Sequence, residues 1–140
     1  MSFGRAASTA GRRPAPTATC PCGSADSFAG CCGPLLAGAP AETAADLMRS
    51  RYTAFVVGDA AHLARTWHPR TRPRDTAPEP GTAWIGLTVV RTEAGGPGED
   101  RGVVEFRARW RDADGVHDLH ETSRFERVRG RWTYVDGDLG

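Results

Sequence analysis

The chain has 140 residues, of which 39% are hydrophobic and 8% aromatic, so it is long enough for one globular domain with a core of its own. Its 18 basic residues, all arginine, nearly balance 17 acidic ones, and this charge balance argues against a nucleic-acid-binding protein. No apolar run approaches the roughly 18 residues that cross a bilayer, which excludes a membrane span.

Residues 1–19 are predicted to be a disordered tail. They combine glycine, proline and small polar residues with three arginines and contain no acidic residue. Nothing in such a segment offsets the conformational entropy lost on ordering. The Arg12-Arg13 pair is followed by residues 14–17, Pro-Ala-Pro-Thr, instead of the apolar stretch of an export signal, so we expect a cytoplasmic protein.

The next segment, residues 20–33, holds the chain's four cysteines, which have the spacing C-x-C-x8-C-C: Cys20, Cys22, Cys31 and Cys32. Tetrahedral Zn²⁺ binds four thiolates at about 2.3 Å, which places the sulfurs about 3.8 Å apart. Adjacent residues have Cα atoms about 3.8 Å apart, so Cys31 and Cys32 can both face one ion. The spacing therefore predicts a small zinc knuckle with Zn²⁺ as its cofactor. A pair of disulfides and a redox-active thiol pair are the alternatives.

A linker and a helix are predicted to follow the knuckle. Residues 34–41 contain glycine and proline and form the linker. Thr43 and Asp46 are a variant capping box, and apolar side chains then recur at helical spacing through residues 47–56. Gly58 is suited to the left-handed conformation that ends a helix.

A second, shorter helix and four strands complete the predicted domain. Asp59 caps the helix and Pro69 ends it, because the residue before a proline avoids the helical region. A proline-rich loop then leads to segments in which apolar residues alternate with polar ones. The predicted strands are residues 83–92, 104–110 and 116–128, and a last strand that carries Trp132 and Tyr134.

This order predicts an α+β domain over residues 42–138, in which helices pack on a curved antiparallel sheet and leave a cavity between the two layers. The candidate pocket residues are Arg51, Trp67, His68, His120, Glu121 and Arg124. If Leu119 and Phe125 face the core, strand alternation buries Glu121 with them, and a buried carboxylate needs a partner. Arg49, Arg51 and His68 are candidates for that partner. Glu121 and its partner then either anchor a ligand or form an ion pair that fixes the sheet on the helix.

Two resemblances follow from these motifs. Residues 20–33 resemble the SEC-C motif, the zinc knuckle also found at the C-terminal tail of the SecA translocase, where the last ligand pair is Cys-His and not Cys-Cys. Four further segments resemble the YchJ family, and they are residues 47–55, 66–73, 119–125 and 132–137. The resemblance covers roughly residues 20–137 and implies a SEC-C knuckle joined to an NTF2-like (cystatin-like) domain.

These observations favour a non-enzymatic adaptor that contacts a protein partner through the knuckle. The SEC-C resemblance implies a partner in the secretion or translation machinery. The NTF2-like resemblance implies, by itself, that the protein can form a homodimer. The alternative is small-molecule binding or enzymatic activity in the cavity. The sequence has no nucleophile elbow, no phosphate-binding glycine loop and no metalloprotease helix, so no catalytic residue is assigned. Nucleic-acid binding would depend on Arg70, Arg72 and Arg74 alone, because no aromatic side chains on which bases could stack accompany them. We therefore do not expect this function.

Overall fold

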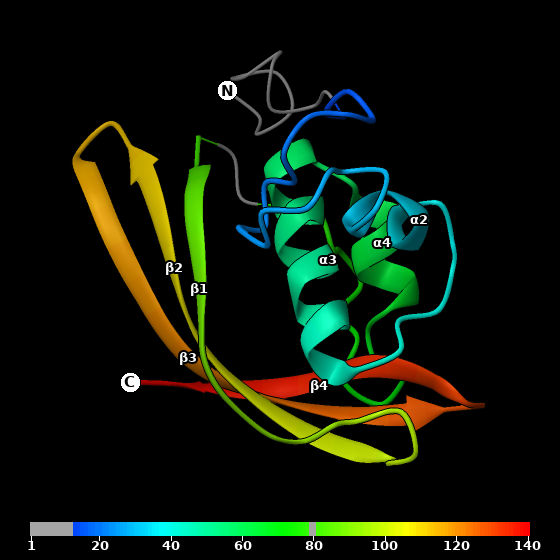
Figure 1. Ribbon diagram of the computed structural model, residues 1–140. Helices are drawn as coiled ribbons and strands as arrows, with labels where there is room; N and C mark the ends of the chain where they lie inside the picture. Colours follow the sequence, from blue (N-terminus) through cyan, green and yellow to red (C-terminus); the bar gives the residue numbers. More distant parts are fainter. Residues whose placement is uncertain (1–12, 79–80) are drawn as a thin grey trace.

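The computed structural model describes residues 13–78 and 81–140, and there three helices pack against one face of a curved four-stranded sheet (Figure 1). The elements in chain order are α2 (Cys32–Leu36), α3 (Ala44–Val57), α4 (Ala60–Arg65), β1 (Ala83–Ala94), β2 (Arg101–Asp112), β3 (Gly115–Val128) and β4 (Arg131–Leu139). Helix α3 lies nearest the sheet, with α2 and α4 beyond it. The predicted α+β order is confirmed. No helix in the described part of the chain is long and apolar enough to cross a bilayer.

Helix α3 begins and ends at the residues that its sequence predicts. The Thr43 hydroxyl accepts a hydrogen bond from the Asp46 backbone N–H at 3.0 Å, which satisfies one of the free donors of the first turn. Gly58 ends the helix with a φ of 79°, in the left-handed region. Asp59 caps α4 as expected, but α4 ends at Arg65, before the predicted stop at Pro69.

The sheet is a meander of antiparallel strands in the order β1-β2-β3-β4. Its register shifts between Trp84 and Gly86, between Val89 and Arg91, and between Arg124 and Phe125. Such irregularities bend a strand and increase its twist, and the sheet in Figure 1 curves so that its concave face surrounds α3. The curved sheet expected from the sequence is therefore confirmed.

The N-terminal boundaries differ from the prediction. Residues 13–19, assigned to a disordered tail, are ordered: Thr19 forms an antiparallel bridge with Ser27, and Arg13 Nη2 lies 2.9 Å from Asp59 Oδ2. The remaining part of that predicted tail, residues 1–12, lies outside the described residues. Residues 34–36 of the predicted linker belong to helix α2. The knuckle and the sheet domain also share one hydrophobic core, which includes Cys22, Phe28 and Tyr52.

The loop between β1 and β2 holds the start of α3 by a close backbone contact. The Ala44 N–H donates to the Gly95 carbonyl at 2.9 Å, and the Gly95 N–H donates to the Arg101 carbonyl at 3.0 Å. A Cβ placed on Gly102 would lie 2.6 Å from the Gly95 Cα and 3.1 Å from the Ala44 Cβ. The contact therefore requires a residue without a side chain at position 102.

Gly102→Ala is expected to lower the free energy of unfolding by about 1–3 kcal/mol, the usual cost of overpacking. The matched control is Gly86→Ala in β1, because a Cβ there would meet only the Arg109 Cβ, at 4.0 Å. Urea denaturation of both variants measures the difference. Equal losses in the two variants would contradict this account of the contact.

A buried histidine joins α3 to α4. His62 is 1% exposed, and its Nε2 lies 2.9 Å from the Ser50 hydroxyl while its Nδ1 lies 3.1 Å from Arg65 Nη2. Because the guanidinium can only donate, Nδ1 accepts and Nε2–H donates to Ser50, which donates in turn to the Leu47 carbonyl at 2.8 Å. Burial, followed by the Arg65 charge, lowers the pKa of His62 to about 4.

This pKa predicts a loss of stability in mild acid. The folded-state pKa of His62, about 4, lies below the ordinary value of 6.5, so the contribution of the neutral ring is complete above pH 6.5 and is lost as the pH falls toward 4. The loss should reach about 3 kcal/mol. The measurement is the unfolding free energy of wild type minus that of His62→Gln, from pH 8 to pH 4. A difference that does not change with pH would show that His62 has the same pKa in the folded and unfolded protein, which would contradict its burial as a neutral ring.

Candidate metal centre and cavity

The chain reverses direction between the two cysteine pairs, and this reversal brings them together. The Phe28 N–H donates to the Ala18 carbonyl and the Cys20 N–H to the Asp26 carbonyl, both at 2.8 Å. Gly23 turns the chain with a φ of 82°, where a Cβ would lie 3.1 Å from the Leu87 carbonyl of β1. The first cysteine pair therefore lies opposite the start of α2, which carries the second.

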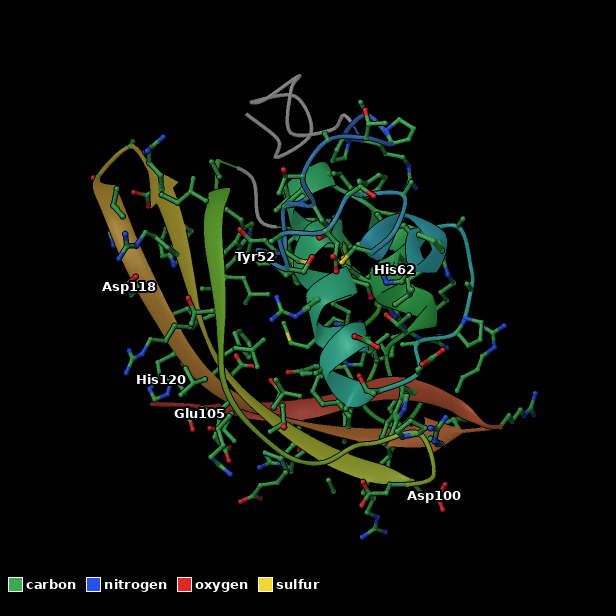
Figure 2. All side chains as sticks on the ribbon, in the orientation of Figure 1. Tyr52, His62, Asp100, Glu105, Asp118 and His120 are labelled. Atoms are coloured by element: carbon green, nitrogen blue, oxygen red, sulfur yellow. The ribbon has the colours of Figure 1, made fainter. Side chains whose placement is uncertain are left out.

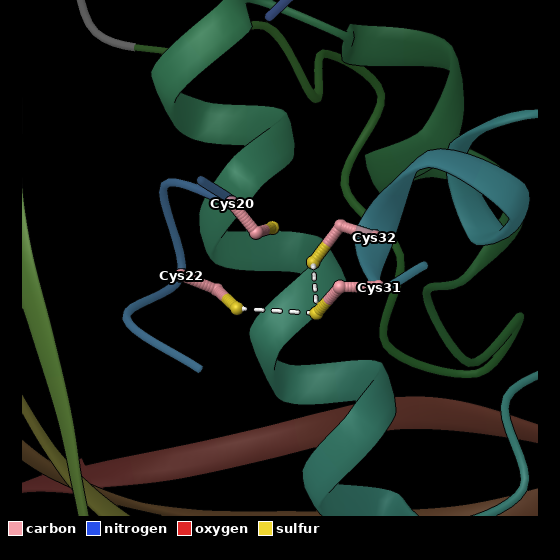
Figure 3. Close-up of side chains that lie close together, drawn as sticks. All are labelled: Cys20, Cys22, Cys31 and Cys32. Carbon is pink, nitrogen blue, oxygen red and sulfur yellow. Dashed lines mark hydrogen bonds between the residues drawn. The ribbon is translucent and has the colours of Figure 1, made fainter. Parts of the chain in front are cut away.

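The four sulfur atoms converge on one point (Figure 3). All four lie within 4.8 Å of one another, with Cys22 Sγ 3.5 Å from Cys31 Sγ and Cys31 Sγ 3.9 Å from Cys32 Sγ. These separations are close to the roughly 3.8 Å between ligand sulfurs around a tetrahedral ion. All four cysteines are free. The arrangement forms a candidate metal centre from the residues that the sequence predicts.

Side chains from the knuckle and from α3 surround the sulfurs. The Thr53 hydroxyl donates to Cys32 Sγ at 3.4 Å and lies 3.9 Å from Cys20 Sγ. The Ser24 hydroxyl lies 3.1 Å from Cys31 Sγ, the half-buried sulfur of the four. Hydrogen bonds of this kind orient ligands and stabilise the negative charge of thiolates. Arg49 Nη1 donates to the Cys22 carbonyl at 2.9 Å, so α3 also holds the backbone of the knuckle.

The four thiols do not ionise independently of one another. The thiols of Cys20 and Cys32 donate to the Cys22 sulfur and hold the pKa of Cys22 well below its ordinary value. Burial raises the pKa of Cys31 to about 11. Four anionic sulfurs at these distances repel one another, so full ionisation of the cluster requires a positive ion between them.

A separate cavity of about 150 Å³ lies between α3 and the sheet. Its walls are mainly aromatic and aliphatic, and they come from α3, the loop after α4 and all four strands: Met48, Arg51, Tyr52, Phe55, Trp67, Trp84, Phe106, Ala108, Leu119, Glu121, Ser123 and Tyr134. Three of the predicted pocket residues, Arg51, Trp67 and Glu121, line it. Tyr52, labelled in Figure 2, lies on α3 with its ring 6.3 Å from that of Trp84.

Glu121 faces the cavity, but its partner differs from those expected. Its Oε2 accepts a hydrogen bond from the Ser123 hydroxyl at 2.7 Å. Arg51 donates to the Leu63 carbonyl at 2.9 Å and to the Thr66 hydroxyl at 2.8 Å. Arg51 and Glu121 therefore line the same cavity without forming a salt bridge.

The other three predicted pocket residues do not line this cavity. His120 and Arg124 alternate with Glu121 along β3, so they lie on the convex face, where Figure 2 shows His120 beside Glu105. His120 Nε2 lies 2.6 Å from Glu105 Oε2, and Arg124 Nε lies 2.6 Å from Asp136 Oδ1. His68 follows α4 and donates its backbone N–H to the Tyr134 carbonyl at 2.8 Å, with its ring near Glu126.

Sequence reasoning missed several residues of both sites. Tyr134 and Trp84 were assigned only to strands. Strand alternation places Tyr134 on the same face as Trp132, but it places Trp84 opposite Leu87, and the register shift between Trp84 and Gly86 brings both to the core side. Thr53 lies on α3 among residues whose apolar spacing predicts only a core-facing helix. Ser24 directly follows the first cysteine pair, and this position could have suggested a hydrogen bond to a metal ligand.

Comparisons with known proteins agree with both parts of the structure. A family model described as "YchJ, middle NTF2-like domain" matches residues 43–137. A UPF0225 protein of Streptomyces coelicolor is 52% identical over 125 residues, which are 89% of this chain and 98% of that protein. A UPF0225 protein of Ralstonia nicotianae is 50% identical over 139 residues, covering 90% of this chain and 94% of its own length.

Two solved structures are similar in fold. The solution structure of a SEC-C motif containing protein from Rhodopseudomonas palustris has a TM-score of 0.77 and 33% identity, and the match covers 87% of this chain and 98% of that one. The crystal structure of a SEC-C motif containing protein from Psychrobacter arcticus has a TM-score of 0.72 and 26% identity. The match covers 89% of this chain and 84% of that one.

Together, the layered α+β fold and the cysteine cluster define an NTF2-like domain preceded by a small cysteine knuckle. The NTF2-like fold expected from the sequence resemblance is therefore confirmed. The chain belongs to the YchJ family, whose middle domain matches most of its length.

Ser24→Ala is expected to weaken metal binding about 10- to 100-fold, because it removes the hydroxyl beside the Cys31 sulfur. The matched control is Ser27→Ala, since the Ser27 hydroxyl accepts a hydrogen bond from the Gly30 backbone N–H at 3.1 Å. Competition of each protein with a chelator measures the affinity. Equal affinities of the two variants would show that Ser24 does not support the site.

Proposed function

We propose that this protein binds one Zn²⁺ ion through Cys20, Cys22, Cys31 and Cys32, and that the zinc-bound knuckle is an adaptor surface for a protein partner. The observation that carries the zinc assignment is the convergence of four sulfurs within 4.8 Å. Four thiolates around one ion are typical of zinc, and they leave no coordination position for a substrate. The role of the ion is accordingly structural.

The ion stabilises the contact between the knuckle and the rest of the domain. Cys20, Cys22 and Cys32 are buried in the same core as Leu47 and Tyr52 of α3. Because zinc ligands gain their geometry only in the folded protein, the free energy of metal binding adds to the stability of this contact. Such a site needs reduced cysteines, and the cytoplasm, where we place the protein, keeps them reduced.

The surface beside the knuckle is negatively charged. A hollow beside Cys31 is lined by Asp26, Glu42 and Asp46, and its one basic side chain, Arg49, is already bonded to the Cys22 carbonyl. A Zn²⁺ ion with four thiolates adds two formal negative charges next to this hollow. These charges favour a partner with a basic segment.

The similarity of residues 20–33 to the knuckle of the SecA translocase indicates which partners to test first. We propose a component of the secretion or translation machinery that presents arginine or lysine residues on its surface. Contacts of this kind depend on charge, so the complex should weaken as the salt concentration rises.

The test is affinity capture from lysate of cells that contain the protein, using wild type and the double variant Asp26→Asn/Glu42→Gln. The expected result is a partner that wild type retains and the double variant loses. Zinc content, measured by elemental analysis, should be one ion per chain in both proteins, because neither changed residue is a ligand.

The matched control carries the same charge change in the β2–β3 hairpin, in Asp114→Asn/Asp118→Asn, and should retain the partner. Identical partner sets for all three proteins would contradict the adaptor role. Absence of zinc from wild-type protein purified without chelators would contradict the metal assignment separately.

A further inference from the structure

The cavity beneath α3 combines an apolar body with a few polar groups at one side. Its volume of about 150 Å³ is close to that of an engineered protein cavity that holds benzene. The aromatic rings of Tyr52, Phe55, Trp84 and Phe106 form much of its wall. A space of this size and character fits one small ring or an aliphatic group of similar size.

Arg51 is the cation of the cavity. It is 3% exposed, and its guanidinium carbon lies 4.8 Å from the ring centre of Trp67 and 4.7 Å from that of Tyr134. Both of its hydrogen bonds, to Leu63 and Thr66, come from Nη1. Neither bond uses Nη2, which leaves that nitrogen to donate to a ligand. Burial lowers the pKa of Arg51 to about 10, which leaves the group charged at neutral pH.

Trp67 supplies a second donor. Its indole Nε1 is buried and has no hydrogen-bond partner within the described part of the chain. A buried donor without a partner costs free energy, and buried polar groups in native proteins are nearly always paired. The side chains of Trp67 and Arg51 line the same cavity, so a small rotation of the indole would bring both donors to one acceptor atom of a bound molecule.

Glu121 supplies the acceptor. Ser123 donates to its Oε2, which leaves the other oxygen to accept from a ligand. Gly137 on the neighbouring strand makes room for the carboxylate, because a Cβ there would collide with Glu121 and come within 3.0 Å of the Ser123 hydroxyl. The cavity therefore presents a cation and an anion that do not pair with each other.

We propose that this cavity binds a small uncharged molecule that has an apolar body of about one ring and a carboxamide-type head. The carbonyl of the head accepts from Arg51 and Trp67, and its N–H donates to Glu121. A carboxylate in the same position would be repelled by Glu121, and an ammonium group would be repelled by Arg51. The proposal is independent of the knuckle and its partner, and goes beyond the adaptor function.

Three probes that share one ring and differ in the charge of the head test this inference: benzamide, benzoate and benzylammonium. Each is titrated into the zinc-loaded, ¹⁵N-labelled full chain at pH 7, with the indole N–H resonance of Trp67 as the readout. Benzamide should shift that resonance and bind at least about tenfold more tightly than either ion, a difference of about 1.4 kcal/mol.

Glu121→Gln removes the preference for benzamide over benzoate. The substitution keeps an acceptor and removes the negative charge, so benzoate should gain about tenfold while benzamide changes little. Glu105→Gln, on the convex face, is the matched control and should leave all three affinities unchanged. Wild type that binds no probe at this resonance, or binds an ion as tightly as benzamide, would overturn the proposal whether or not the variant folds. An unchanged benzoate affinity in a folded Glu121→Gln protein would overturn it as well.

Discussion

The burial of helix α3 on nearly every side is the constraint on which both sites depend. Its interior position forces Ser50, Arg51 and Thr53 to be buried, and a buried polar side chain needs a hydrogen-bond partner. Ser50 forms a hydrogen bond with His62, and Thr53 donates a hydrogen bond to a sulfur of the knuckle. Arg51 reaches the Leu63 carbonyl. The polar residues of this single helix thus connect the metal centre, helix α4 and the cavity.

The knuckle is part of the domain's core and not an appended module. Phe28 and Leu36 pack in the same cluster as the apolar residues of α3 and the sheet, and Gly23 approaches the backbone of β1. Burial of this kind would shield a bound ion from water and couple its binding to the packing of the domain. The exposed side of the knuckle stays available for contacts, whereas the side that faces α3 is purely structural.

Local signals in the sequence were sufficient for the cysteine cluster, the start of α3 and the strands. The cysteine spacing, the capping pair at Thr43 and the alternation of apolar residues all act over a few residues. The partners of Arg51 and Glu121 were not predictable, because they depend on how distant elements pack. Combining Glu121 with His120 and Arg124 in one pocket was wrong for a local reason, since neighbours on a strand face opposite sides. The order of residues 13–19 comes from pairing with residues 26–29, which composition does not reveal.

The order of the cysteines, helix α3 and strand β1 along the chain has a consequence for biosynthesis. A nascent protein leaves the ribosome from its N-terminus, and domains fold only when their parts have emerged. Cys20 and Cys22 therefore emerge about thirty residues before Thr53, and well before the strand whose backbone Gly23 contacts. During that interval the thiols have neither their helix nor their sheet to cover them. Early capture of an ion would protect them from oxidation while the remainder of the polypeptide is still being made.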